Sequence, residues 1–289
     1  MKQFLLTLIF LLTITLLYSQ EQKTEPKSKK FHVGLAYAYT NADLTLTQMT
    51  HESRIGEMQL EPFTLSKEDI DDLNSFMNWN DKTQSLCIVF GMFLLNKPDH
   101  KWQVDANVLF GLSGLQYQVQ DTRNDTMRLT STSSLQKPTV GLEVQLKYAF
   151  DKHWGILLEP CFSYSWGKLT SINDKLNARL DFFTETREHE FNYIYSRMNA
   201  MASYSTKRFS FSAGPGVYFL YFTNKYTITR TNPSTGSVTE DMTKSKLHSK
   251  FPIDGVVNVT WKIIDPLTFR VQCVLGTDFL IQPGLFFNF

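Results

Sequence analysis

Acidic and basic side chains stand between alternating apolar residues in several stretches of the sequence, and these residues are the best placed to do chemistry. Side chains at alternate positions of an extended strand share one face, so charges spaced in this way lie together while the apolar residues between them cover the opposite face. Both signs are present, so ion pairs are expected. The set is Asp105, Glu143, Lys147, Glu159, Arg197, Asp254, Lys262 and Arg270.

The histidines and serines of the chain give little sign of catalysis or metal binding. The six histidines are scattered, with neither an HExxH motif nor a metal-binding pair at helix spacing. The nearest approach to a serine–histidine pair is His248 with Ser249, which would need an acid at the same rim to form a membrane-embedded hydrolase. We therefore predict no enzyme, no cofactor and no metal, and keep the hydrolase as an alternative.

Five stretches in which apolar and other residues alternate predict strands, and they carry these charges except Arg197 and Arg270. They cover residues 102–112, 140–150, 154–166, 209–221 and 253–263, and their alternate apolar positions hold no charged residue. These runs are longer than the ~5–6 residues of an ordinary strand and reach the ~9–11 residues that a tilted strand needs to cross a bilayer. We expect strands whose apolar face meets lipid.

Aromatic residues lie at the ends of the apolar faces, where hydrocarbon would meet lipid headgroups. The expected aromatic girdle consists of Trp102, Tyr117, Tyr148, Trp154, Trp166, Tyr221 and Trp261.

The alternation of apolar residues changes phase between Leu112 and Leu115, which predicts a β-bulge near Gly114.

Short and long connections alternate along the chain, which is typical of outer-membrane barrels with short periplasmic turns and long external loops. Two long connections are predicted to hold short helices. Ser66 with Asp69, and Ser171 with Asp174, have the spacing of a helix start and precede apolar residues at helical spacing. The long connections are residues 46–85, 121–135, 170–188 and 223–247, and the short ones are 96–100, 151–153, 205–207 and 265–266.

These patterns predict an all-β protein: an antiparallel up-and-down transmembrane β-barrel of about ten strands, within a range of eight to twelve, with short helices in external loops. The first strand is placed at residues 31–40 and the last pair within 267–289. Both chain termini then fall on the periplasmic side of the membrane. The alternative architecture is a soluble periplasmic β-sandwich, in which the same apolar faces would point inward.

The N-terminal residues predict export. Lys2 precedes an apolar run that is short for a membrane-spanning helix, and Ser19 is a small residue of the kind found at signal-peptide cleavage sites. Residues 1–19 are therefore taken as a signal peptide. Residues 20–30 are predicted as a flexible leader and 31–289 as one barrel domain.

Net charge and hydropathy argue against two features, nucleic-acid binding and transmembrane helices. The chain has 29 basic and 28 acidic residues, a balance that argues against nucleic-acid binding. The mean hydropathy is −0.23, and no second long apolar run follows the N-terminal one, so no transmembrane helix is expected after residue 19.

The final residues combine with the other patterns into a family resemblance. Leu285, Phe287 and Phe289 alternate up to the last position, like the terminal strand by which bacterial outer-membrane barrels are recognised for assembly. With the Tyr18–Ser19–Gln20 signal ending and the strand layout, the chain resembles the PorT-like outer-membrane β-barrel proteins of Bacteroidota. The resemblance implies residence in the outer membrane, contact with its lipid and lipopolysaccharide, and insertion by the barrel-assembly machinery.

The predicted barrel size decides between interpretations of the inward charges. Side chains just fill the interior of a barrel of about eight strands, and ten strands leave little more room. We interpret the charges as a salt-bridged plug and predict a structural or interaction component of the cell envelope. Some PorT-like proteins are tied to secretion, which implies envelope protein partners that meet the external loops. A small-solute channel along the same charges is one alternative, and the membrane-embedded hydrolase is the other.

Overall fold

The computed structural model describes residues 30–95, 101–123, 126–132, 136–176, 182–249, 253–276 and 279–289. The predicted signal peptide and nearly all of the predicted leader lie outside this part of the chain. The strands are β1 (Phe31–Ile55), β2 (Met58–Gln59), β3 (Phe63–Thr64), β4 (Met77–Leu95), β5 (Trp102–Asp121), β6 (Thr126–Thr132), β7 (Lys137–Ala149), β8 (Trp154–Leu176), β9 (Phe182–Ser205), β10 (Phe209–Thr231), β11 (Val238–Ser249), β12 (Ile253–Lys262), β13 (Leu267–Leu275) and β14 (Phe279–Asn288), and the helix is α2 (Lys67–Phe76).

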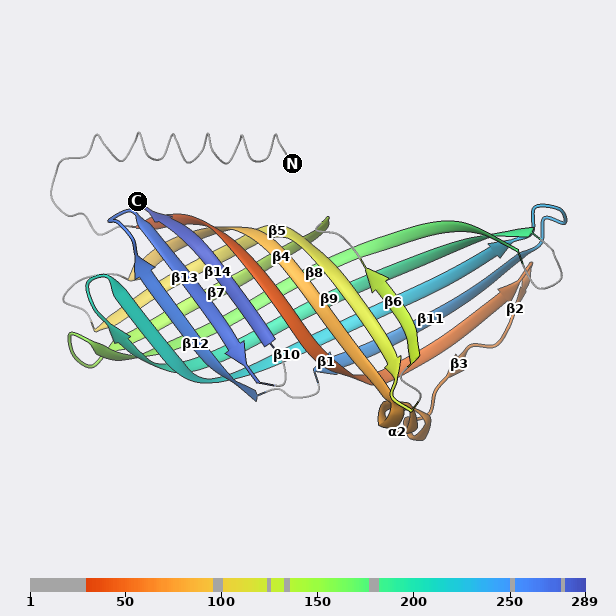
Figure 1. Cartoon of the computed structure of the whole chain (residues 1–289), viewed down its shortest axis with the longest axis horizontal. Helices are drawn as coiled ribbons and strands as arrows, with labels where there is room; N and C mark the ends of the chain where they lie inside the picture. Colours follow the sequence, from red (N-terminus) through yellow and green to blue (C-terminus); the bar gives the residue numbers. More distant parts are fainter. Residues whose placement is uncertain are drawn as a thin grey trace.

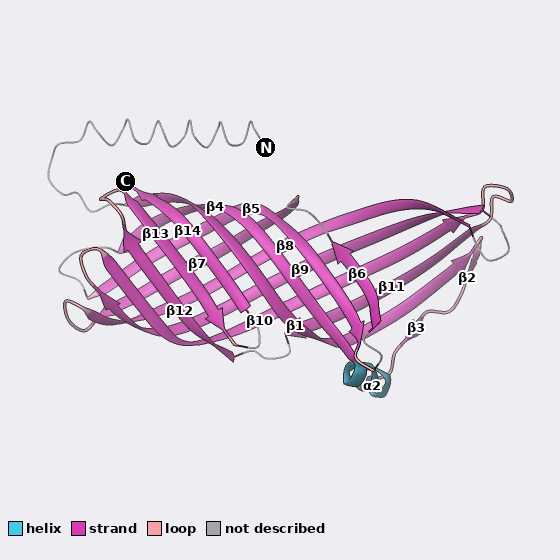
Figure 2. Ribbon diagram, viewed as in Figure 1, coloured by secondary structure: helices cyan, strands magenta, loops and turns pink. Residues whose placement is uncertain are grey.

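The strands form one closed antiparallel sheet (Figures 1 and 2). Among the described residues, ten of them follow one another around the ring in the order β1, β14, β13, β12, β10, β9, β8, β7, β5 and β4, and pairing of β4 with β1 closes it. The predicted barrel of about ten strands is confirmed. Closure leaves no free sheet edge in this ring, which a wall surrounded by lipid requires.

The outer surface of the ring is apolar. Phe110 on β5, Phe162 on β8 and Phe219 on β10 expose about half of their side chains, whereas Glu159, at an alternate position of β8, is completely buried. In a sandwich these phenylalanines would be covered by a second sheet. The exterior is therefore the lipid-facing surface of a transmembrane β-barrel, and the sandwich alternative is wrong. Among the described residues no helix is long and apolar enough to cross a membrane.

One seam of the ring joins sequence positions near the two ends of the chain. β1 pairs with β14 from His32–Asn288 to Asn41–Phe279. The backbone N–H of Phe289 donates to the carbonyl of Phe31 at 2.9 Å, and the N–H of Phe31 donates back at 3.1 Å. The last strand thus completes the wall, and the role of Leu285, Phe287 and Phe289 as an assembly signal stays a prediction.

The barrel changes width along its length because β11 takes the place of three other strands. β10 pairs with β12 over residues 209–217 and with β11 over 221–231. β1 pairs in the same way with β14 and then with β11. We call the end with the short connections the turn end, and the end reached by β1 and β8–β11 the extended end (Figure 1). The extended end is the narrower one.

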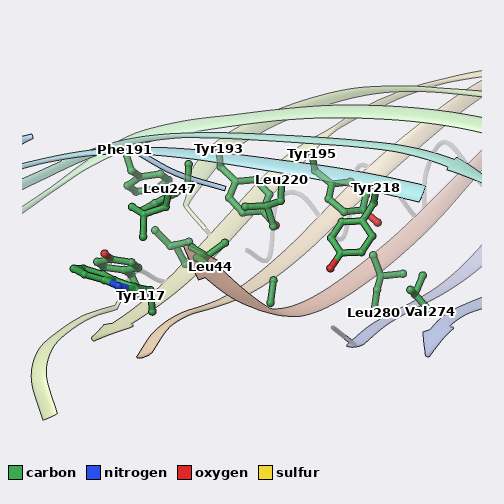
Figure 3. Packing of buried hydrophobic residues seen from close by; sticks show 14 of the residues in the cluster. Leu44, Tyr117, Phe191, Tyr193, Tyr195, Tyr218, Leu220, Leu247, Val274 and Leu280 are labelled. Atoms are coloured by element: carbon green, nitrogen blue, oxygen red, sulfur yellow. The ribbon is translucent and has the colours of Figure 1, made fainter. Parts of the chain in front are cut away.

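The narrower section is filled by apolar side chains. Leu220, Phe222 and Leu247 are completely buried, and Figure 3 shows Leu247 close to Phe191, with Tyr117 below them. We call this group the apolar cluster. It also contains Ala42, Leu44, Leu46, Ile70, Trp79, Leu115, Val119, Leu157, Tyr193, Tyr195, Met201, Tyr218, Val256, Val274 and Leu280. The last three lie on β12, β13 and β14, so the cluster extends into the wider section.

Two predictions about residues in and beside the apolar cluster are wrong. Tyr117 was expected in the aromatic girdle, but only 1% of it is exposed and it points into the barrel. The bulge near Gly114 is also wrong, because β4 and β5 stay in register through Gln84–Gly114 and Thr83–Leu115. The change in the sequence pattern marks the level at which inward side chains turn from polar to apolar, while the strand continues unchanged.

The helix α2 confirms the first of the two predicted helices. The hydroxyl of Ser66 accepts the backbone N–H of Asp69 at 3.2 Å, and the Asp69 carboxylate accepts the backbone N–H of Ser66 at 3.1 Å. Hydrogen bonding from the Ser66 hydroxyl and then from its backbone lowers the pKa of Asp69. Ile70 is buried in the apolar cluster, and Asn74 bonds both backbone groups of Leu46, so the helix docks on β1.

The second predicted helix is wrong. Residues Ser171–Leu176 belong to β8 and pair with β9 up to Leu176–Phe182. The capping signal at Ser171 and Asp174 is overridden because β9, paired on its other side with β10, supplies backbone partners to every residue of this segment. Most of the predicted loops 170–188 and 223–247 are likewise extensions of strands.

The inward or outward direction of each tryptophan can be measured. The chain has five tryptophans; Trp79 is buried inside the barrel, whereas about half of Trp154 is exposed on the outside. In single-tryptophan variants with phenylalanine at the other four positions, brominated acyl chains should quench most of the Trp154 fluorescence and little of the Trp79 fluorescence. Equal quenching of both residues would contradict the assigned faces.

Candidate functional site

Four of the predicted inward charges meet in the wider section of the barrel. Glu143 on β7, Glu159 on β8, Arg197 on β9 and Arg270 on β13 are all buried. Each of them alternates along its strand with lipid-facing residues, so the strand period itself turns these side chains inward. We call these four residues and the amides bonded to them the lumen network.

The first part of the lumen network crosses the barrel. Arg270 Nη2 donates to both carboxylate oxygens of Glu143, at 2.8 and 2.9 Å. Asn107 Nδ2 donates to Glu143 Oε1 at 3.1 Å. β7 and β13 are five steps apart in the ring of ten strands, so this ion pair joins opposite walls.

The second part is centred on Glu159. Its carboxylate accepts hydrogen bonds from Asn199 at 2.9 Å, from Gln145 at 2.9 Å, from Arg197 at 3.5 Å, and from the side-chain amide of Gln272. The amide oxygen of Gln272 accepts in turn from Arg197 Nη2. The hydrogen-bonding capacity of this buried carboxylate is thus satisfied by protein groups instead of water.

One amide joins the two parts. Gln145 Nε2 lies 3.3 Å from Glu143 Oε1 and 2.9 Å from Glu159 Oε2. The lumen network therefore contains two carboxylates and two guanidinium groups, and its net charge is zero. Burying single charges would be costly, but a balanced, hydrogen-bonded set of this kind can persist inside a lumen.

The other predicted residues do not all join the network. Asp105 lies beside it, with one oxygen 3.8 Å from Nδ1 of His32. Lys147 donates to the Ser205 hydroxyl at 2.5 Å, and Lys262 pairs with Asp265 at an exposed turn. The last residue, Asp254, is buried away from the network, and within the described residues its carboxylate oxygens have no hydrogen-bond partner.

Neutral side chains that the sequence analysis did not single out complete the site. Asn107, Asn199 and Gln272 are at most 2% exposed. His32 Nε2 and Asn107 Oδ1 are 2.6 Å apart, and a Cβ atom at Gly91 would lie 2.0 Å from the same nitrogen, so this close approach requires glycine there. Asn107 and Gln145 occupy the inward positions of two alternating runs, and that position was the available signal.

Cavities lie on both sides of the lumen network. Towards the turn end, a cavity of about 310 Å³ is lined by His32, Asp105, Lys262 and Arg270, among others, and a second of about 190 Å³ shares Asp105 with it. Towards the apolar cluster, a space lined largely by small side chains such as Ala36 has a volume of about 60 Å³. Side chains thus fill the lumen at two adjoining levels, which meet where Arg197 Nη1 donates to the hydroxyl of Tyr195 at 3.3 Å.

The hydrolase candidate does not form in this structure. His248 and Ser249 are adjacent on β11, so their side chains lie on opposite faces of the sheet. His248 Nδ1 lies 2.9 Å from the backbone carbonyl oxygen of Ser249, and the buried Ser249 hydroxyl accepts from the backbone N–H of Leu220 at 3.4 Å. Among the described residues, no three histidine, cysteine or acidic side chains are arranged to hold a metal.

No protein-family model and no curated protein matches the sequence. The structure is similar to that of the outer-membrane protease OmpT from Escherichia coli, with 11% identity, a TM-score of 0.39, and coverage of 93% of this chain and 99% of that one. The transport unit of the autotransporter AIDA-I from Escherichia coli matches with 10% identity, a TM-score of 0.36 and coverage of 93% and 92%. A mutant of the monoaromatic hydrocarbon channel TodX matches with 9% identity, a TM-score of 0.37 and coverage of 91% of each chain. At these values the likeness is one of fold alone, and the fold assignment rests on the strand pairing and the apolar exterior.

Removing one charge from the lumen network should destabilise the barrel. In Glu143→Gln the Arg270 guanidinium stays buried without its partner, and breaking a buried pair in this way costs about 3–5 kcal/mol. Equilibrium urea unfolding in lipid vesicles would measure the loss. The matched control is Glu52→Gln, which removes the exposed pair with Lys244 and should cost about 0–1 kcal/mol. Equal effects of the two changes would contradict a structural role for the network.

Proposed function

We propose that this chain is an outer-membrane β-barrel protein with a closed lumen, which acts as a structural or interaction component of the cell envelope. The observation that carries the proposal is the filling of the lumen at two levels. The Glu143–Arg270 pair spans the wider section, and the apolar cluster fills the narrower one. A barrel filled in this way keeps the two sides of a membrane separate, and both of its rims stay accessible to other envelope components.

The lipid-facing exterior and the N-terminal pattern support placement in the outer membrane. Antiparallel barrels with an apolar outer band and aromatic rings at its borders are the form in which strands cross that membrane. Trp102, Trp154 and Trp261 are exposed on strands near the turn end, and Trp166 is exposed towards the extended end. The export signal predicted at residues 1–19, and the resemblance to PorT-like proteins, point to the same envelope and to a link with secretion.

The extended end supports an interaction role. Figure 1 shows β8–β11 and part of β1 reaching well past the ends of β4 and β5. Arg230 fixes this extension by donating to Glu185 at 3.1 Å on β9 and to Asp241 at 2.9 Å on β11. A raised wall held by paired charges is a firm surface for another envelope protein, and on the proposed orientation it faces the cell exterior.

The small-solute channel remains the second candidate because of the cavities near the turn end. A solute entering there would meet Asp105, Lys262 and Arg270 in a space of about 310 Å³. It would pass further only if the lumen network and the apolar cluster both moved aside. The structure offers the entry space, and conductance measurements test the passage.

The purified protein should show no steady conductance in planar lipid bilayers. A variant with alanine at Tyr117, Arg197, Phe222 and Arg270 removes side chains from both levels, and it should conduct if it folds. Heat-dependent gel mobility checks the folding of each protein. The control variant carries two lipid-facing changes, Phe110→Ala and Phe219→Ala, and it should show no steady conductance. Steady openings of the unmodified protein would favour the channel over the closed barrel.

The proposed role is not enzymatic, and the separation of His248 from the Ser249 hydroxyl supports this. A fluorophosphonate probe, which labels activated serines, should not react with the folded protein in detergent. Labelling that is lost in Ser249→Ala but kept in Ser205→Ala would support the hydrolase hypothesis, because only Ser249 belongs to the candidate pair.

A further inference from the structure

Three lysines point outward from neighbouring strands on the wall of the extended end. Lys225 on β10 lies directly opposite Lys244 on β11, and Lys246 lies two residues further along β11, opposite Thr223. Like charges placed opposite each other on one sheet face are destabilising unless something of opposite charge lies between them. We call these three residues the lysine patch.

The lysine patch begins where the lipid-facing belt ends. Tyr164 stacks on Trp166 with ring centres 5.2 Å apart, and Phe219 stacks on Tyr221 at 6.3 Å. Pairs of rings of this kind mark the border between hydrocarbon and headgroups. At about 3.3 Å per residue, Lys225 is only about 13 Å along the strand from Tyr221. Its flexible side chain therefore ends among the headgroups.

A groove on this outer wall brings the lysines together with neutral hydrogen-bonding groups. Its volume is about 440 Å³, within the usual range for small-molecule sites. It is lined by side chains from β1, β9, β10 and β11. They include Gln48, Thr50, Glu190, Asn192, Thr223, Lys225, Lys244 and Lys246.

Nearby glutamates neutralise only part of the positive charge. Glu52 pairs with Lys244 at 2.6 Å. Glu190 lies 3.8 Å from Lys225, but it also lies 3.5 Å from Lys168, which has a shorter bond to Glu188 at 2.8 Å. Among the described residues, Lys246 has no ion pair. The three lysines thus face two carboxylates, those of Glu52 and Glu190, and the groove keeps the ammonium group of Lys246 for a ligand, beside amides and hydroxyls.

We propose that the lysine patch binds the phosphorylated sugar headgroup of a glycolipid in the leaflet that surrounds the extended end. The lysines would bind the phosphate as point charges. Gln48, Thr50, Asn192 and Thr223 would hydrogen-bond the sugar hydroxyls. A lipid is a better match than a free sugar phosphate, because the groove opens sideways beside the hydrocarbon border. The inference rests on the proposed outer-membrane placement and adds a binding site to it.

The test compares lipids on the full-length protein in detergent, by native mass spectrometry. Diphosphorylated lipid A should bind, and dephosphorylated lipid A with the same acyl chains should bind at least tenfold more weakly. Millimolar inorganic phosphate should not displace the lipid. Equal binding of the two lipids would overturn the proposal, and displacement by inorganic phosphate would show an anion site without lipid specificity, which also overturns it.

Variants locate the site on the wall. Changing Lys225, Lys244 and Lys246 together to glutamine should weaken lipid A binding about 100-fold, since each lysine near a headgroup is worth roughly fivefold. The matched control changes the exposed Lys101, Lys152 and Lys207 at the turn end to glutamine, and it should stay within twofold of the unmodified protein. Equal losses in both variants would overturn the assignment.

Gel mobility separates this proposal from the proposed function. A folded, heat-modifiable barrel that binds both lipids equally would refute the lysine site and leave the membrane barrel standing. A protein that stays soluble without detergent would refute the membrane placement itself. If the triple variant does not fold, Lys246→Glu replaces it, because Lys246 has no ion pair within the described part of the chain. This single change should still weaken binding at least fivefold.

Discussion

The need of every membrane-spanning strand for a partner on both sides governs this structure. Backbone N–H and C=O groups facing hydrocarbon have no water to bond, so a wall of strands in a membrane must close on itself. Here β1 completes the closure, because it pairs with β4 on one side and with β14 and then β11 on the other. The alternation of outward apolar and inward polar residues has meaning only in a closed wall, and the lumen network exists because closure brings β7 and β13 face to face.

The width of each section of the lumen corresponds to the polarity of the side chains that fill it. In the section built with β12, β13 and β14, the space is wide enough for charged and amide side chains that reach across to one another, as Arg270 does to Glu143. Where β11 alone joins β1 to β10, the lumen narrows and side chains such as Leu220 and Phe222 fill it without polar partners. Long polar residues satisfy each other over a distance, whereas apolar residues need direct contact.

The sequence was sufficient for the class of fold and for the direction of most side chains, because a strand period of two can be read locally. It also placed Glu143, Glu159, Arg197 and Arg270 on inward positions. The pairing of Glu143 with Arg270 could not be predicted, since it depends on which strands face each other after closure. Tyr117 was misplaced for a related reason: an apolar residue that follows a lipid-facing run looks the same in sequence whether it faces lipid or a filled lumen. The second helix failed because pairing of β8 with β9 outweighs a local capping signal.

The position of β11 also bears on the order in which the barrel can be made. Its partners are β10, next to it in the chain, and β1, which contacts it through pairs such as Thr45 with His248. Contacts between residues so far apart in sequence form late, because a long loop must close before they contribute. The hairpins from β7 to β10 can assemble from local contacts, but the narrow section stays open until β11 has paired with β1. Until then, the side chains of the apolar cluster are exposed, and the incompletely folded chain depends on protection from aggregation.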